Sequence, residues 1–185
     1  DNLGLWLDKS SLQYFGSTAA PSILSFYPAL GVKRDVRSEP ALSNYALRGL
    51  LSVEYLLTTP EKQADLEAVA DDGWVYWDTM DGFAVYRNQN YVPMGFTYQY
   101  YLTQEQLAQY PEHQRANLLM RALVLSEEDA ETYGKYLEKL PEAKLDDLWY
   151  DTYVSDCADR RASACSSFQM TNSGFHAEIT LKKDD

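Results

Sequence analysis

The sequence predicts an α+β fold: a mixed β-sheet with a central hairpin and flanking helices, followed by a C-terminal β-hairpin. Residues 74–102 contain two strand patterns joined by Asp81-Gly82, a dipeptide favoured in tight hairpin turns, and then a third strand pattern. Helical patterns lie on both sides of this stretch. At 185 residues, with 45% hydrophobic and 14% aromatic side chains, the chain can form a packed core.

The N-terminal part of the chain carries one strand pattern and one helix pattern. Alternating leucines predict a short strand over residues 3–7. Pro21 fits the first turn of a helix over residues 22–30, and Gly31 follows its end. Residues 32–40 are charged and turn-prone, so we expect a surface loop there.

The next segments alternate between helix and strand. We expect a helix over residues 41–51 and a buried strand over residues 52–58, which are rich in β-branched, aromatic and leucine side chains. Thr59 is suited to cap the next helix, with Pro60 at its first position and an end near Ala70.

The central stretch combines a hairpin with a separate strand. Residues 74–78 and 83–88 are the predicted hairpin arms, and residues 96–102 resume as a strand. Residues 103–106 fit a capping box that starts a short helix ending near Pro111.

Helical patterns dominate the third quarter of the chain. A helix over residues 112–121 is followed by a strand over residues 122–125. Residues 126–129 give a second capping signal, and Pro141 closes the apolar stripe that follows. That stripe comprises Ala130, Tyr133, Leu137 and Leu140, and we expect one continuous helix along it. A further helix is expected over residues 145–154.

The composition turns small and polar at residues 155–167, which suggests two parts. The prediction is an α+β domain over residues 1–154, then a linker and C-terminal hairpin over residues 155–185. The hairpin arms are residues 167–171 and 175–181, and their alternation predicts one buried face. One interpretation is that this hairpin begins a following β-rich region.

The charge and the cysteines exclude several functions. A net charge of −12 disfavours nucleic acids and anionic membranes as partners. Cys157 and Cys165 lack zinc-site spacing, so a local disulfide and two free thiols both stay open.

No run reaches the roughly 18 apolar residues of a membrane helix. Because the chain opens on Asp1 without a methionine or a signal peptide, we expect a piece of a longer protein.

Catalytic motifs are absent from the sequence. Its two histidines fit no metal or triad spacing, and no phosphate-binding glycine loop occurs. We therefore predict no catalytic residues, no metal and no cofactor. Carboxylates are abundant, but most are explained by helix starts and turns. A secreted carbohydrate hydrolase would require two of them to converge in a cleft.

Aromatic residues crowd the predicted hairpin. Trp74, Tyr76, Trp77 and Tyr86 could form a sugar-binding platform, since tryptophan and tyrosine combine an apolar ring with a polar group. Packing of these rings beneath the flanking helices is the favoured alternative.

An ordered set of short blocks runs through nearly the whole chain. The blocks are Tyr14-Phe15-Gly16-Ser17-Thr18, Pro21-Ser22, Phe26-Tyr27, Leu47-Arg48-Gly49-Leu50-Leu51-Ser52-Val53, Tyr55-Leu56-Leu57, Gly82-Phe83, Val85-Tyr86, Asn88, Pro93-Met94-Gly95-Phe96, Ala122-Leu123-Val124-Leu125, Asn172, Gly174-Phe175 and Ala177. In this set the chain resembles the extracytoplasmic region of YfhO-like bacterial membrane proteins. It departs from the family pattern at Arg87, often an acidic residue there, and at Tyr91-Val92, which replaces a smaller pair.

The resemblance implies a parent protein with many membrane helices, similar to GT-C-type glycosyltransferases. Such enzymes transfer a sugar from a polyprenyl-phosphate carrier to a cell-wall or lipoteichoic polymer at the outer face of the cell membrane. Their catalytic acidic residues are expected in a loop outside this chain. The chain would then be an extracellular acceptor-binding or structural lobe, in contact with the membrane helices of the same protein. A partner-docking domain and a secreted carbohydrate-binding module are the alternatives.

The predicted ligand-binding residues are Tyr14, Ser17, Thr18, Asn88 and Tyr91. We expect a ligand first at the loop over residues 88–93. An acidic lobe would repel an anionic polymer unless divalent ions or a local basic patch intervened. The candidate patch comprises Lys33, Arg34, Arg37 and Arg48, and a solvated loop is the alternative interpretation of the first three.

Overall fold

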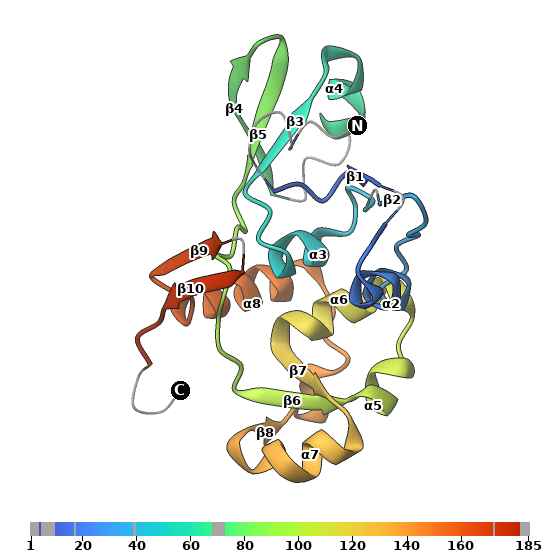
Figure 1. Ribbon diagram of the computed structural model, residues 1–185, viewed down its shortest axis with the longest axis vertical. Coiled ribbons are helices and arrows are strands. Elements are labelled where there is room, and N and C mark those ends of the chain that lie inside the picture. Colours follow the sequence, from blue (N-terminus) through green and yellow to red (C-terminus); the bar gives the residue numbers. More distant parts are fainter. Residues whose placement is uncertain are drawn as a thin grey trace.

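The computed structural model describes residue 4 and residues 10–16, 18–38, 40–67, 73–171 and 173–181. Two three-stranded sheets lie at opposite ends of the molecule, and helices α3, α6 and α8 lie between them (Figure 1). Two short two-stranded sheets complete the described fold. The α+β prediction is confirmed, including the central hairpin and the C-terminal hairpin.

The upper sheet in Figure 1 has the order β3-β5-β4 and is antiparallel throughout. Strands β4 (Trp74–Met80) and β5 (Phe83–Asn88) form the predicted hairpin, and β3 (Tyr55–Thr58) pairs with β5. Asp81 and Gly82 both have positive φ, 49° and 82°, as a two-residue hairpin turn with the twist of the strands requires.

Helix α4 (Pro60–Glu67) packs on one face of this sheet, where Leu66, Trp74 and Tyr86 are buried together. The buried strand predicted over residues 52–58 is shorter and more exposed than expected. Only four of these residues form β3, and Tyr55 is 43% exposed. The physical reason is that β3 is an edge strand with only one side of its sheet against the core.

The lower sheet has the order β7-β6-β8 and is parallel. Its central strand β6 (Tyr100–Thr103) connects to β7 (Ala122–Leu125) through helices α5 (Gln104–Ala108) and α6 (Glu112–Arg121). Helix α7 (Glu127–Tyr133) connects β7 to β8 (Glu138–Lys139). Parallel neighbours need such helical crossovers. The strand predicted after the hairpin therefore belongs to a second sheet.

Several helix boundaries in this half of the chain follow the sequence signals. Thr103 and Gln106 form the predicted capping box, with both reciprocal hydrogen bonds present. The Ser126 hydroxyl accepts a hydrogen bond from the Asp129 amide at 3.0 Å, as predicted for the start of α7. The predicted change from helix to strand between Arg121 and Ala122 is also confirmed.

The long helix predicted through Leu140 is wrong. Helix α7 ends at Tyr133, a 3₁₀ turn follows over Gly134–Tyr136, and the chain then enters β8. The amide of Leu140 donates to the carbonyl of Tyr101 at 2.9 Å, and Leu140 is buried in the core of the lower sheet. Of the predicted stripe, only Leu140 is buried, directly after β8, whereas Tyr133 at the end of α7 is 52% exposed.

The helix predicted over residues 145–154 is displaced. A 3₁₀ turn occupies Glu142–Lys144, and α8 covers Tyr150–Ala162. The first part of the predicted linker, residues 155–162, is therefore helical. Its polar composition reflects the solvent-facing side of α8. The division into two domains stays a prediction.

The middle of the molecule is a helical core. Helices α2 (Pro21–Ala29), α3 (Tyr45–Leu50), α6 and α8 surround buried side chains that include Leu30, Leu47, Met120, Tyr153 and Cys157. Helix α2 matches its prediction, whereas α3 begins later than predicted, with the Asn44 side chain as its cap. Cys157 and Cys165 are free thiols.

A two-stranded sheet of short strands lies in the N-terminal part of the described chain. Strand β1 (Tyr14–Phe15) pairs with β2 (Arg37–Ser38), which lies inside the predicted loop over residues 32–40. The strand predicted over residues 3–7 falls outside the described residues, apart from residue 4.

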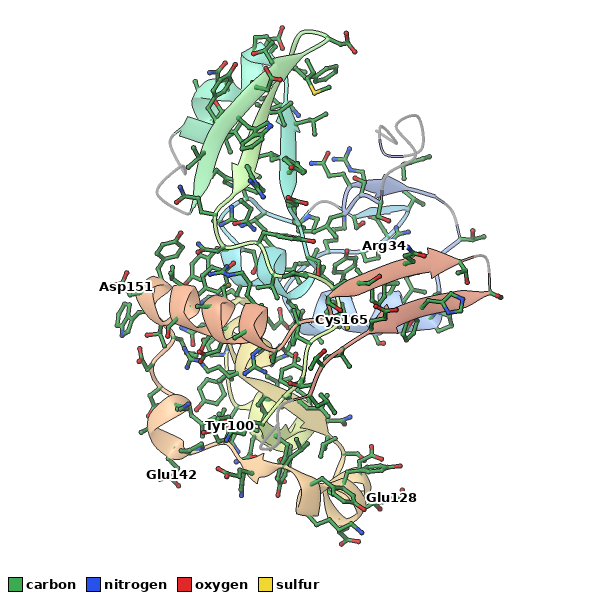
Figure 2. All side chains as sticks on the ribbon, turned by 90° about the vertical axis from the view of Figure 1, so that its left-hand side faces the viewer. Arg34, Tyr100, Glu128, Glu142, Asp151 and Cys165 are labelled. Atoms are coloured by element: carbon green, nitrogen blue, oxygen red, sulfur yellow. The ribbon has the colours of Figure 1, made fainter. Side chains whose placement is uncertain are left out.

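The C-terminal hairpin consists of β9 (Ser167–Thr171) and β10 (Gly174–Glu178). The prediction that one of its faces is buried is wrong, because Phe175 is 63% exposed and Leu181 is 59% exposed. Phe175 instead stacks on Phe168 across the hairpin, at 5.2 Å between ring centroids. Figure 2 shows the hairpin projecting from the body of the molecule beside Cys165.

Candidate functional site

The predicted ligand-binding residues lie in two separate parts of the chain. Tyr14 begins β1, Thr18 is exposed beyond that strand, and Ser17 lies outside the described residues. Asn88 ends β5 and Tyr91 lies in the loop that follows. No hydrogen bond or ring contact between described residues joins Thr18 to either of them. Their role in ligand binding stays a prediction.

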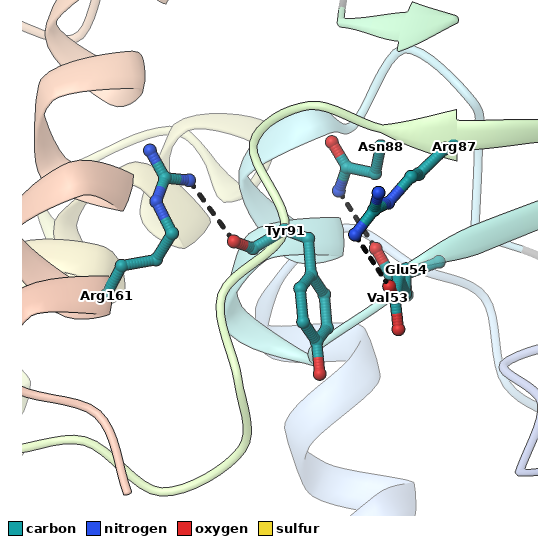
Figure 3. A network of polar contacts seen from close by, with 6 residues as sticks. All are labelled: Val53, Glu54, Arg87, Asn88, Tyr91 and Arg161. Carbon is teal, nitrogen blue, oxygen red and sulfur yellow. Dashed lines mark hydrogen bonds and ion pairs between the residues drawn. The ribbon is translucent and has the colours of Figure 1, made fainter. Parts of the chain in front are cut away.

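Hydrogen bonds join the loop after β5 to the segment before β3 and to helix α8 (Figure 3). The Asn88 side-chain amide donates to the Val53 carbonyl at 2.9 Å, and its oxygen accepts from the Asn90 amide at 2.9 Å. Arg161 of α8 donates to the Tyr91 carbonyl at 3.1 Å. Because the Asn88 side chain is 3% exposed, these bonds fix the path of the chain between the upper sheet and α8.

Of the predicted basic patch of Lys33, Arg34, Arg37 and Arg48, the structure removes only Arg48 from the surface. Arg48 is only 6% exposed, and its guanidinium lies over the Trp74 ring at 4.9 Å from the centroid. Lys33 forms an ion pair with Asp35 at 3.2 Å. Stacking on an aromatic ring keeps the arginine charge inside the fold, where it is unavailable to a polymer.

A cleft of about 340 Å³ lies between the segment 97–100, which leads into β6, and helix α8. Its lining is Thr97, Tyr98, Gln99, Tyr100, Arg121, Lys144, Asp156, Asp159, Arg160, Ala162 and Ser163. Three cationic and two anionic side chains line it, which sums to +1 in a chain whose net charge is −12. The cleft therefore carries a small positive charge on an otherwise acidic molecule.

A buried ion pair forms one wall of the cleft. The Arg121 Nε donates to Asp156 Oδ2 at 2.6 Å, and the Arg121 Nη1 donates to the Lys144 carbonyl at 2.6 Å. The two charged side chains are 4% and 14% exposed. Burial raises the pKa of Asp156, and the Arg121 guanidinium opposes that shift. Arg121 thereby ties α6 and the 3₁₀ turn at Glu142–Lys144 to α8.

Aromatic rings position the other two cations of the cleft. The Arg160 guanidinium lies 5.3 Å from the centroid of the Tyr98 ring and donates to the Thr97 carbonyl. The Lys144 ammonium lies 4.6 Å from the centroid of the Tyr100 ring, which is labelled in Figure 2. Such cation–π contacts hold a charge in place without neutralising it.

Tyr98 also serves the structure of the cleft. Its hydroxyl donates to the Leu119 carbonyl at 2.7 Å, which anchors the segment 97–100 to α6. Burial raises the pKa of Tyr98 to about 12, with the nearby Arg160 charge acting in the opposite direction. The phenol is therefore protonated at neutral pH and remains a hydrogen-bond donor.

The chemistry of this lining suits an anionic, hydroxyl-rich ligand. The Lys144 and Arg160 cations can bind a phosphate or carboxylate, while Asp159 and the Gln99 amide can bond to hydroxyl groups. Asp156 and Asp159 also supply the two carboxylates that a hydrolase would need, but Asp156 is engaged by Arg121. A hydrolase role stays a prediction. The described residues include no cluster of three His, Cys, Asp or Glu side chains suited to a metal.

The sequence did not reveal this cleft because its walls come from segments far apart in the chain. One local signal was available. Arg121 interrupts the apolar run over residues 118–125, and a charge inside an apolar run needs a buried partner. That signal predicts an ion pair, but it does not identify Asp156 as the partner.

The described residues form an α+β fold with a cleft lined by charged and aromatic side chains. No helix among the described residues has the length and apolar character needed to cross a membrane. The family model described as "Bacterial membrane protein YfhO" matches residues 1–181. The chain therefore belongs to the YfhO family of bacterial membrane proteins. No curated protein and no solved structure matches it.

Proposed function

We propose that this chain is the extracellular domain of a membrane glycosyltransferase of the YfhO family, and that it recognises the acceptor polymer. Membership of the family supports the link to a membrane protein. The resemblance to enzymes that use lipid-linked sugars supports the type of reaction. The catalytic residues would lie elsewhere in the full-length protein, and its membrane helices would bind the polyprenyl-phosphate sugar.

The cleft between the segment 97–100 and helix α8, called the α8 cleft below, is the observation that supports acceptor recognition. A teichoic-acid type of polymer repeats a phosphate group and hydroxyl groups along its length, and the cleft presents cations and hydroxyl-binding groups together. The rest of the molecule is strongly acidic, so it repels the polymer away from the cleft. This arrangement would guide an anionic polymer to one place on the surface.

Lys144 provides the sharpest test of this role. Its side chain contributes its charge to the cleft, while the bond to Arg121 comes from its backbone carbonyl and survives substitution. In the full-length protein, Lys144→Ala should raise the KM for a phosphate-bearing acceptor about tenfold, the equivalent of one charged hydrogen bond, and leave kcat unchanged.

Lys135 is the matched control, because its ammonium also lies over a tyrosine ring, that of Tyr136, but outside the cleft. Lys135→Ala should leave the KM for the acceptor unchanged. Equal effects of the two substitutions, or an unchanged KM in Lys144→Ala, would count against acceptor recognition by the cleft.

The extracellular location has its own test. Glu142 is exposed, so a Glu142→Cys substitution in a Cys165→Ser background offers one accessible thiol within this chain, with Cys157 buried, and the Cys165→Ser protein is the reference for labelling. A membrane-impermeant maleimide should label this protein in intact cells. Labelling only after the cells are broken would place the domain inside and refute the proposal.

A partner-docking role is the second candidate, and the exposed apolar side chains of the β9–β10 hairpin favour it. An isolated two-stranded hairpin is marginally stable, so a partner would add to its stability. Under this alternative, the hairpin should resist proteolysis in the full-length protein, and Lys144→Ala should have no effect on transfer.

A further inference from the structure

The upper sheet has a second face, opposite the one that α4 covers. Tyr55, Arg87 and Val75 are direct neighbours across β3, β5 and β4, and they share this face by strand alternation. Figure 2 shows the β4–β5 hairpin in front with α4 behind it, so this face is turned toward the viewer. Its exposed large side chains are Tyr55 (43%), Leu57 (36%), Val75 (45%) and Trp77 (57%).

Trp77 lies on this face two residues after Val75, at a β-bulge in β4. The register of β4 on β5 shifts between Tyr76 and Asp78, so that Trp77 is the extra residue. The Arg87 guanidinium lies 5.0 Å from the centroid of the Trp77 ring, which shows that both side chains lie on the same side of the sheet. Bulges often re-aim a side chain at a functional site. Here the shift places Asp78 opposite Val85, on the same face as Arg87, whereas strict alternation would have pointed Asp78 toward the α4 side.

Polar groups lie between the aromatic side chains. Arg87 forms an ion pair with Glu54 at 3.3 Å, and the two side chains are 46% and 31% exposed (Figure 3). Tyr91 borders the pair. Burial raises the pKa of Tyr91, and the nearby Glu54 and Tyr55 raise it further, so its hydroxyl is a donor at neutral pH.

This combination has the chemistry of a sugar-binding surface. A pyranose ring has an apolar C–H face that packs on an indole or phenol ring, and it has hydroxyl groups at its edge. A carboxylate and a guanidinium held side by side offer acceptors and donors for those hydroxyls. Because the charges of Arg87 and Glu54 cancel while Asp78 lies nearby on the same face, an anionic ligand gains no attraction there.

We propose that this face binds a neutral oligosaccharide, with pyranose rings stacked on Trp77 and Tyr55 and hydroxyl groups bonded to Glu54 and Arg87. The site shares no residue with the α8 cleft, so it does not depend on acceptor recognition there. The two sites differ in the charge of the ligand that each selects.

The test is a titration of the 185-residue chain with neutral hexasaccharides of glucose, galactose, mannose and N-acetylglucosamine, each to about 10 mM. The expected result is a saturable change in tryptophan fluorescence with at least one of them. Trp77→Ala should weaken the binding about tenfold or more, as expected for loss of one aromatic stacking partner. Glu54→Gln should weaken it by a smaller factor, since the amide keeps one acceptor.

Trp149 supplies the matched control, because it is 75% exposed and belongs to the start of α8 rather than to the upper sheet. Trp149→Ala should bind as the unsubstituted chain does. The proposal is overturned if no hexasaccharide gives a saturable change, or if Trp77→Ala binds with unchanged affinity. It is also overturned if the chain dimerises in sedimentation experiments and Trp77→Ala abolishes the dimer, because the face would then contact a second copy.

Discussion

Arg121 shows how a single residue can define the structure of the candidate site. It is buried at the end of α6, and it bonds to Asp156 and to the Lys144 carbonyl. Burial of an arginine is favourable only when its charge and its donors have partners. The same residue therefore holds three segments together and shapes the cleft. Its position in an apolar run was visible in the sequence, whereas its partners were not.

Removing one partner of this pair should destabilise the chain strongly. Asp156→Asn leaves the Arg121 charge buried without a counter-ion, and we expect a loss of about 3–5 kcal/mol in the free energy of unfolding. Urea denaturation measures it. Replacing both residues, with Arg121→Met and Asp156→Leu, should cost less than Asp156→Asn alone. A loss below about 1 kcal/mol for Asp156→Asn would mean that the pair is solvated.

The Cys157 thiol should make the stability depend on pH in the alkaline range. Burial raises the pKa of Cys157 to about 11, above the value of about 8.5 for an exposed thiol. Between these two values the unfolded chain loses its proton while the folded chain keeps it. The free energy of unfolding should therefore fall as the pH rises from about 8.5 to 11.

Denaturation at a series of pH values measures this effect, with Cys157→Ala as the control. That variant should show a smaller decline over the same range, because the thiol no longer contributes. Identical declines in the two proteins would contradict a buried, protonated Cys157.

The start of an element was easier to predict than its end. Thr103 and Ser126 carry local capping signals, and both helices begin where those signals predict. The end of α7 depends on Gly134 and on the pairing of β8 with β6, and this pairing is a contact between distant residues. The helical spacing of Ala130, Tyr133, Leu137 and Leu140 does not reveal that the chain leaves the helix and that Leu140 is buried next to a strand.

The contact of α3 with α8 provides a prediction for the packing of elements. A Cβ at Gly49 would lie 2.9 Å from the Tyr153 hydroxyl and 3.3 Å from the Cys157 sulfur. Gly49→Ala should therefore destabilise the chain by about 1–3 kcal/mol through overpacking. Thermal unfolding measures it, and Tyr153→Phe should recover part of the loss when combined with Gly49→Ala, since it removes the closest atom. Strict additivity of the two substitutions would contradict this contact.

At the scale of the whole molecule, local sequence patterns predicted the elements but not their grouping. The stretch at residues 74–102 reads as three consecutive strands, yet β6 lies in a separate parallel sheet at the other end of the molecule. Strands of four residues carry too little pattern to identify their neighbours. The same limit applies to the cleft, whose lining residues come from segments spread over residues 97–163.

The charge distribution of the whole molecule also differs from the expectation. The predicted basic patch loses Arg48 to the core, while Arg121, Lys144 and Arg160 gather at a place that no local cluster of charges indicated. If the α8 cleft recognises the acceptor, the chain should bind an anionic polymer in a salt-dependent manner. Ions screen both the attraction within the cleft and the repulsion around it.

The most direct test is therefore a calorimetric titration of the chain with an oligomer of glycerol phosphate at low and moderate salt. Acceptor recognition by the cleft predicts saturable binding that weakens as the salt concentration rises. It also predicts an affinity about tenfold lower in Lys144→Ala, and unchanged in Lys135→Ala. Absence of binding at low salt, or equal affinities of the unsubstituted chain and Lys144→Ala, would contradict the account.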